Sequence, residues 1–156
     1  METTKNKTTL LIMAAGMGSR FGSLKQLALL GPHKKTLLHY SIYDAVHAGF
    51  DKIVFIIRRS FENEFKEAVG KYAESLVETV YCFQEMDQLP GNLPPIQREK
   101  PWGTAHAIWA AKDHIHEPFI AINADDFYGR DAFVKMHDFV ASNPDERCFS
   151  LAGYRL

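Results

Sequence analysis

The sequence predicts an α/β fold in which a mostly parallel sheet is covered by helices on both faces. Apolar, strand-like runs alternate with segments of helical periodicity along the 156 residues. The run 52–57, KIVFII, is almost entirely β-branched or aromatic after its first residue, as expected of a strand buried on both faces. Four of the seven prolines lie between residues 87 and 101, so one long loop interrupts the alternation.

The first elements are predicted from an apolar run and an amphipathic segment. The run 10–15, LLIMAA, predicts a strand, which Gly16 and Gly18 end with a turn. Residues 36–48 predict a helix because apolar side chains recur at helical spacing on one face, and Gly49 supplies its stop. The strand at 52–57 follows directly.

The remaining elements continue the alternation. Residues 61–69 predict a helix with Gly70 near its end, and residues 104–115 predict an alanine-rich helix. The other predicted elements are strands at 76–83, 119–122 and 148–156, and a helix at 131–140.

Composition bounds the class of protein. An apolar content of 46% and a charged content of 24% are ordinary for a globular domain, and the net charge of −1 argues against a surface that coats nucleic acid. Cys82 and Cys148 lie in apolar runs and are predicted to be core residues of a protein in a reducing compartment. With no apolar leader or membrane-length run, we expect a cytoplasmic protein with a polar tail at 1–8 and one domain at 9–156.

The stretch 10–26, LLIMAAGMGSRFGSLKQ, is the most informative part of the chain. A glycine turn after a buried strand exposes backbone N–H groups, and Arg20 and Lys25 add two positive charges. This combination predicts a phosphate cradle for a nucleoside triphosphate. The alternative is that the glycines only make a tight turn.

Two similar glycine motifs are excluded. A Walker A loop needs a glycine followed directly by Lys and Ser or Thr, which this stretch lacks. A dinucleotide fingerprint needs a third glycine three residues after Gly18, where Phe21 follows Arg20, and an acidic residue near the end of the second strand, where Arg58 and Arg59 stand. A dinucleotide-dependent oxidoreductase is therefore disfavoured.

Two further polar clusters follow predicted strands. Gln84 and Glu85 follow the third strand, and the segment 123–126, Asn-Ala-Asp-Asp, follows the fourth. Because the carboxyl ends of parallel strands meet at one edge of a sheet, both clusters should converge there with the glycine loop.

Each cluster has a chemical use and a structural alternative. Asp125 or Asp126, closing a strand predicted to be buried, would hold Mg²⁺ on a triphosphate; alternatively, either residue caps a turn that starts at Phe127. Gln84 offers a donor and an acceptor to the imide edge of uracil or thymine, or is simply solvated. Gly103 either lets a flat base approach the backbone or marks a helix start that Thr104 caps. His106 either lines the pocket or packs.

The ordered set AAGMGSRFG with LKQ, PWGTAHA and NADDFYG resembles the sugar-phosphate nucleotidyltransferases, also called nucleoside-diphosphate-sugar pyrophosphorylases. The resemblance covers residues 10–156. It implies a Rossmann-like three-layer α/β/α sandwich with a mostly parallel, mixed central sheet. It also implies transfer of a nucleotidyl group from UTP or dTTP to a sugar 1-phosphate, with release of pyrophosphate.

The resemblance also implies roles for single residues. Arg20 would stabilise the transferring and leaving phosphates, Lys25 would contact the α-phosphate or the sugar phosphate, and Asp125 would hold Mg²⁺. Asp126 lies one residue past the usual metal position. The residues expected to bind the nucleotide are Ala14, Ala15, Gly16, Met17, Gly18, Ser19, Gln84, Gly103 and Thr104.

The chain departs from the family pattern in two places. Leu24 precedes Lys25 where the family usually has a proline. Family members also continue past the last residue of this sequence, and their later half supplies a second metal aspartate and much of the sugar pocket. We therefore expect a C-terminally truncated, nucleotide-binding part with reduced or no turnover; the alternative is a non-catalytic regulatory module. An exposed sheet edge would permit a homo-oligomer.

Overall fold

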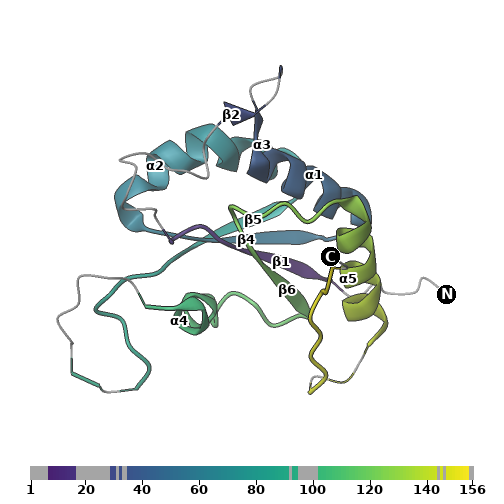
Figure 1. Cartoon of the computed structure of the whole chain (residues 1–156). Helices are drawn as coiled ribbons and strands as arrows, with labels where there is room; N and C mark the ends of the chain where they lie inside the picture. Colours follow the sequence, from purple (N-terminus) through teal and green to yellow (C-terminus); the bar gives the residue numbers. More distant parts are fainter. Residues whose placement is uncertain are drawn as a thin grey trace.

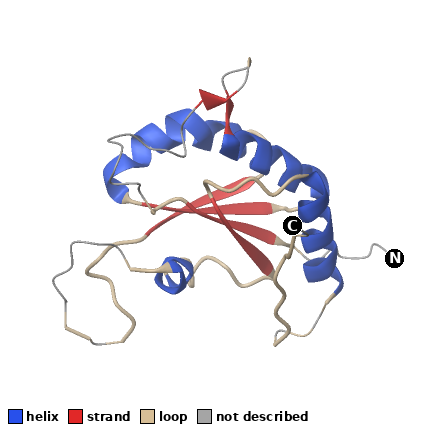
Figure 2. Cartoon of the chain, in the orientation of Figure 1, coloured by secondary structure: helices blue, strands red, loops and turns tan. Residues whose placement is uncertain are grey.

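A four-stranded parallel sheet lies at the centre of the fold. The computed structural model describes residues 7–16, 29–30, 32, 35–91, 93–94, 102–143, 145 and 147–154. The sheet has the order β5-β4-β1-β6, and its strands are β1 (Thr9–Met13), β4 (Lys52–Ile57), β5 (Glu78–Phe83) and β6 (Phe119–Asn123). The strands fan across one another with the usual sheet twist (Figure 2). A separate antiparallel pair joins β2 (Leu29–Leu30) to β3 (Lys35–Thr36).

Helices cover both faces of this sheet, which confirms the predicted three-layer α/β/α arrangement. Figure 1 shows α1, α2 and α3 on one side and α4 on the other. Their bounds are α1 (Leu37–Ala48), η2 (Arg59–Phe61), α2 (Glu62–Phe65), η3 (Lys66–Gly70), α3 (Lys71–Glu74), α4 (Thr104–Trp109) and α5 (Arg130–Ser142). None of these described helices has the length and apolarity needed to cross a membrane.

The strand order explains which helix lies on which face. The chain steps from β1 to β4 to β5 in one direction, and then returns across β1 to β6. Parallel crossover connections are right-handed, so reversing the direction of travel moves the connection to the opposite face. For this reason α4, which connects β5 to β6, packs on the face away from α1.

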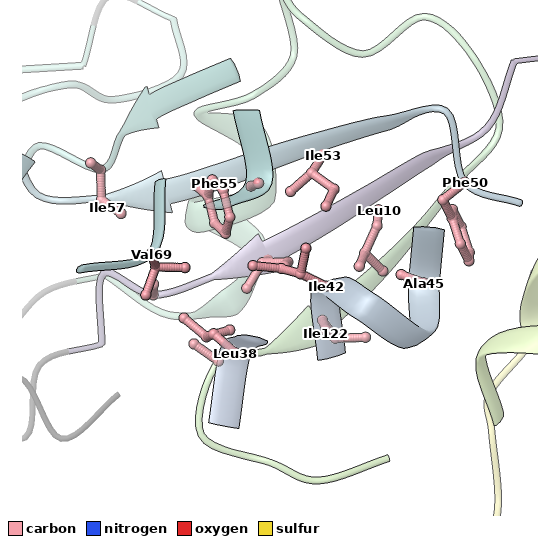
Figure 3. Close-up of a cluster of buried hydrophobic side chains, with 14 of the residues drawn as sticks. Leu10, Leu38, Ile42, Ala45, Phe50, Ile53, Phe55, Ile57, Val69 and Ile122 are labelled. Carbon is pink, nitrogen blue, oxygen red and sulfur yellow. The ribbon is translucent and has the colours of Figure 1, made fainter. Parts of the chain in front are cut away.

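Alternate residues of the inner strands feed two separate cores. On β4, Phe55 and its alternate neighbours Ile53 and Ile57 join the large cluster beneath α1 (Figure 3). Val54 and Ile56 point the other way, into a smaller cluster with alanines of the α4 segment. All six residues of β4 are buried, which confirms the prediction of a strand covered on both faces.

The first predicted helix is confirmed, with Thr36 as its N-cap. The Thr36 backbone N–H donates to His39 Nδ1 at 3.2 Å. At the other end Gly49 adopts the left-handed conformation, φ 114°, and its N–H bonds the carbonyls of the last turn. Glycine suits this stop because other residues rarely adopt a positive φ.

The second helix extends beyond both ends of its predicted range, 61–69. The helical segment runs from Arg59 to Glu74, and Gly70 stays helical inside it. A Cβ at Gly70 would lie 2.2 Å from the Tyr81 hydroxyl oxygen. The glycine is thus required by the close approach of the helix to β5, and it does not end the helix. The third predicted helix, 104–115, is shorter than expected, because α4 ends at Trp109 and turns follow it.

The last predicted strand, 148–156, is wrong over the residues that the structure describes. Residues 148–154 have no strand, and Phe149 and Leu151 are 90% and 99% exposed. A strand needs a partner for its backbone groups, and the described sheet ends at β6 without pairing this segment. Cys148 is accordingly exposed, against the prediction of a core residue, whereas Cys82 is buried as predicted.

A partly buried ion pair joins the strands at the edge of the sheet opposite to their carboxyl ends. Lys52 Nζ donates to Glu117 Oε1 at 3.0 Å and to the His114 carbonyl at 2.5 Å, and the Thr9 hydroxyl also donates to Glu117. Burial alone would raise the pKa of Glu117, but the bonds from Thr9, Lys52 and the His116 amide lower it to about 2. This pair fixes the entry to β6 against β1 and β4.

Stability should therefore fall in acid because of Glu117. Its pKa of about 2 in the folded chain lies below the ordinary 4.5, so the unfolded chain takes up the proton first. The contribution is complete above about pH 5 and is lost as the pH falls towards 2, with a magnitude of roughly 1 to 2 kcal/mol once solvent screening of this partly exposed carboxylate is allowed for. Denaturant unfolding at several pH values measures it.

The Glu117→Gln variant should lose much less stability than the wild type over that pH range. Glu67→Gln, at an exposed pair with Lys71, is the matched control and should keep the wild-type acid profile. Parallel pH profiles for the wild type and Glu117→Gln would contradict this assignment.

Candidate functional site

The segments that follow β1, β5 and β6 emerge at one edge of the sheet, as predicted. The Ala14 N–H donates to the Ile56 carbonyl at 2.8 Å, and the Ala124 N–H donates to the Met13 carbonyl at 3.1 Å. On the far side of β4, the Gln84 N–H donates to the Ile57 carbonyl at 3.0 Å. Since neighbouring strands are about 4.8 Å apart, Gln84 and Ala124 lie roughly 14 Å from each other across this carboxyl edge.

The described part of the glycine loop consists of its first three residues. Ala14 and Ala15 are buried in the cores on opposite faces of the sheet, and Gly16 is exposed. A Cβ at Gly16 would meet no atom of the described residues within 4 Å. The other predicted loop residues, which are Met17, Gly18, Ser19, Arg20 and Lys25, lie outside the described residues.

Gln84 is buried and bonded, which overturns the alternative of a solvated side chain. It is 7% exposed. Its Nε2 donates to the carbonyl oxygens of Trp102, at 3.0 Å, and Gly103, at 3.4 Å, and lies 3.2 Å from His106 Nδ1. The two residues expected to face the base, Gln84 and Gly103, are therefore in direct contact.

Gly103 itself is the N-cap of α4, so the assignment of that cap to Thr104 is wrong. Thr104 is the first helical residue, and the Gly103 carbonyl accepts from the amides of His106 and Ala107. With φ −72° and ψ −172°, Gly103 has a conformation open to any residue, and a Cβ there meets nothing within 4 Å in the described part of the chain. Both Gly103 and Thr104 are exposed at the site.

The two aspartates after β6 are exposed and play different parts. β6 is an edge strand with exposed positions, so the expectation that Asp125 and Asp126 close a buried strand is wrong. Asp126 Oδ2 accepts from Asn123 Nδ2 at 2.9 Å and from the Tyr128 hydroxyl at 3.3 Å. Burial raises the pKa of Tyr128, so its hydroxyl remains a donor. Asp125 accepts no such bond from the residues that the structure describes.

No turn starts at Phe127 for either aspartate to cap, so that alternative is wrong in the form in which it was predicted. Residues 126–129 are not helical, and the N-cap of α5 is Gly129. Asp126 therefore closes the turn between β6 and α5, while Asp125 presents a carboxylate to solvent at the site.

Asp125 fits a metal that the substrate helps to hold. Across the described ranges, no group of three or more His, Cys, Asp or Glu side chains is placed to bind a metal ion. Mg²⁺ commonly takes one or two protein carboxylates and completes its shell with phosphate oxygens and water. A single exposed aspartate at the strand end meets that need when a triphosphate lies beside it.

Sequence reasoning missed the network that closes the loop between β5 and α4. The Trp102 indole N–H donates to the Met86 carbonyl at 3.0 Å, and His106 Nε2 lies 2.5 Å from the Gln88 carbonyl. The short spacing from Gly103 to His106 was visible in the sequence. The carbonyl groups of Met86 and Gln88 could not be predicted as partners, because no local pattern places them beside Trp102 and His106.

Comparison with known proteins identifies related sequences. A family model described as nucleotidyl transferase matches residues 9–154. The UTP–glucose-1-phosphate uridylyltransferase of Bacillus subtilis is 28% identical over 130 residues, which are 74% of this chain and 43% of that protein. The bifunctional protein GlmU of Staphylococcus haemolyticus is 30% identical over 107 residues, 69% of this chain and 19% of that protein. The chain thus spans less than half the length of these curated relatives.

Solved structures share the fold. A UDP-glucose pyrophosphorylase complexed with UDP-glucose superposes with a TM-score of 0.55 at 19% identity, over 85% of this chain and 53% of that one. A putative glucose-1-phosphate thymidylyltransferase from Bacillus anthracis, in complex with a sucrose, gives 0.62 at 18% identity, over 85% and 50%. At these identities the likeness establishes the architecture alone.

Substitution of Gly103 should separate binding from stability. Gly103→Ser should change the free energy of unfolding by about 0.5 kcal/mol or less, since serine is a good N-cap and its Cβ meets open space. Affinity for UTP should fall about tenfold or more, because the side chain would enter the space of the base. Gly153→Ser, at another uncrowded and exposed glycine, is the control. Unchanged affinity in Gly103→Ser would remove Gly103 from the site.

Proposed function

The chain belongs to the nucleotidyl transferase family, and we propose that the protein transfers a nucleotidyl group from UTP or dTTP to a sugar 1-phosphate, releasing pyrophosphate. One observation carries this proposal. The carboxyl edge of the sheet holds Gly16, Asp125 and the bonded pair of Gln84 and Gly103. The name of the Bacillus subtilis relative, UTP–glucose-1-phosphate uridylyltransferase, supports the same class of substrates.

The proposed reaction is an in-line phosphoryl displacement. An oxygen of the sugar 1-phosphate forms a bond to the α-phosphorus as the bond from that phosphorus to the pyrophosphate oxygen breaks. The attacking phosphate is already ionised near neutral pH, so no side chain has to remove a proton. The protein must align the two substrates, and it must neutralise the negative charge that develops on the α-phosphate and the leaving pyrophosphate.

Arg20 and Lys25 are proposed for that neutralisation. Both lie outside the described residues, in the loop that continues from Gly16. Gly16 is placed at the end of β1, beside Ala124 and two strands from Gln84, so a nucleotide lying along the edge would have its phosphates over this loop. We assign Arg20 to the transferring and leaving phosphates and Lys25 to the α-phosphate or sugar phosphate.

Asp125 is the proposed metal ligand, and Asp126 is not, because its carboxylate closes a turn. A Mg²⁺ ion held there would neutralise charge on the triphosphate. The second candidate function is nucleotide binding without turnover.

Pyrophosphate release tests the proposal. With Mg²⁺ and a panel of nucleoside triphosphates and sugar 1-phosphates, release should be greatest with UTP or dTTP. Arg20→Ala and Asp125→Asn should each lower kcat/KM about a hundredfold or more, because each removes charge stabilisation at the reacting phosphates. Asp126→Asn and Arg147→Ala, at the turn and at an exposed surface pair, should stay within a few-fold of the wild type.

Three outcomes are informative. Binding of UTP without pyrophosphate release selects the second candidate function. Failure to bind any nucleoside triphosphate contradicts both candidates. Equal losses in Asp125→Asn and Asp126→Asn would contradict the assignment of the metal to Asp125.

A further inference from the structure

The orientation of the Gln84 side-chain amide follows from the atoms that surround it. The carbonyl oxygens of Trp102 and Gly103 lie 3.0 and 3.4 Å from Nε2. Carbonyl oxygens can only accept, so the part of the amide that faces them must be the NH₂ group. The orientation of this buried side chain is therefore determined by the loop that begins α4.

The same reasoning determines the protonation of His106. Its Nε2 lies 2.5 Å from the Gln88 carbonyl oxygen, so this nitrogen carries the proton and donates. In the neutral ring Nδ1 is then an acceptor, and it receives the Gln84 NH₂ at 3.2 Å. The imidazole also has the rings of Trp102 and Trp109 as neighbours, with ring centroids 6.0 and 5.4 Å away.

This arrangement changes what Gln84 can offer to a ligand. Its two N–H groups are shared among three acceptors of the protein itself, which are the carbonyl oxygens of Trp102 and Gly103 and the Nδ1 atom of His106. The group left for a ligand is the carbonyl oxygen Oε1. Within the described residues no donor bonds that oxygen. The sequence predicted that Gln84 offers the base a donor and an acceptor side by side. Because the protein itself takes up the NH₂ donor, only the acceptor Oε1 is left for the base.

We propose that His106 is a positioning residue for base selection: by accepting the Gln84 NH₂ on Nδ1, it holds Oε1 towards the nucleotide base. This inference rests on the proposed binding of UTP or dTTP. Uracil and thymine carry a hydrogen on N3 that Oε1 would accept. Cytosine has a lone pair on N3, which Oε1 would repel, so a fixed Oε1 discriminates against CTP.

The two ring nitrogens of His106 separate this role from a structural one. Nδ1 contacts Gln84, whereas Nε2 anchors the loop at Gln88. Asparagine places its amide oxygen near the position of Nδ1 and keeps the acceptor for Gln84. Glutamine places its amide NH₂ near the position of Nε2 and keeps the bond to Gln88. The two variants therefore remove opposite halves of the network.

Calorimetric titration of the whole chain with UTP and with CTP, in the presence of Mg²⁺, is the first measurement. The wild type should prefer UTP, and His106→Asn should keep that preference. His106→Gln should lose it by about threefold to tenfold, the size expected from one misdirected hydrogen bond. His114→Gln, at an exposed histidine of the turn after α4, is the control and should behave as the wild type.

Nuclear magnetic resonance of the Gln84 side-chain amide is the second measurement, made without nucleotide and assigned with Gln84→Glu. Exchange of the two NH₂ hydrogens with solvent should stay as slow as in the wild type in His106→Asn and become faster in His106→Gln, whatever shift the loss of the aromatic ring produces in both. Thermal unfolding of each variant confirms that it is folded.

The outcomes distinguish the inference from the function on which it rests. A wild type that binds neither nucleotide overturns both. A wild type that prefers UTP overturns the inference alone if His106→Gln keeps the preference, or if His106→Asn loses it to the same degree. Solvent exchange of the Gln84 NH₂ hydrogens that neither substitution changes would also overturn it.

Discussion

Strands β1 and β4 are buried on both faces, and this burial determines where the polar side chains of the fold can lie. Each strand sends alternate side chains into two cores, one beneath α1 and one against α4. No face of these strands is left for polar chemistry, because burying unpaired polar groups costs free energy. Polar side chains are therefore concentrated at the two ends of the strands, and the two ends serve different purposes.

At one end the polar groups satisfy one another. Lys52, Glu117 and Thr9 form a closed set in which the buried cation has a carboxylate and a carbonyl as partners. Such a pair is costly to break, because removing one partner leaves a charge out of water. We interpret this edge as structural: it holds the start of β6 beside β1, and so it brings Asp125 next to the glycine loop.

At the carboxyl edge the polar groups are only partly used by the protein. Asp126 and Asn123 are taken up by a turn, and the Gln84 NH₂ by the loop that begins α4. Asp125, Gly16 and Gly103 remain exposed there. A preorganised edge of this kind suits nucleotidyl transfer, in which placement and charge neutralisation do most of the work.

Local periodicity and apolar runs such as 52–57 were enough to predict the α/β class, the inner strands, the first helix and the strand ends at which the candidate site lies. Four other features could not be predicted in this way: the helix continues through Gly70, 148–154 lacks a strand, Asp126 closes a turn, and the Gln84 NH₂ group bonds the protein itself. The physical reason is the same for all four features, since each depends on which residues come into contact. Gly70 packs against Tyr81, and 148–154 has no partner strand among the described residues. Asp126 bonds Tyr128, and Gln84 contacts Trp102 and His106. A local sequence pattern carries no information about such contacts, because only the fold brings these residues together.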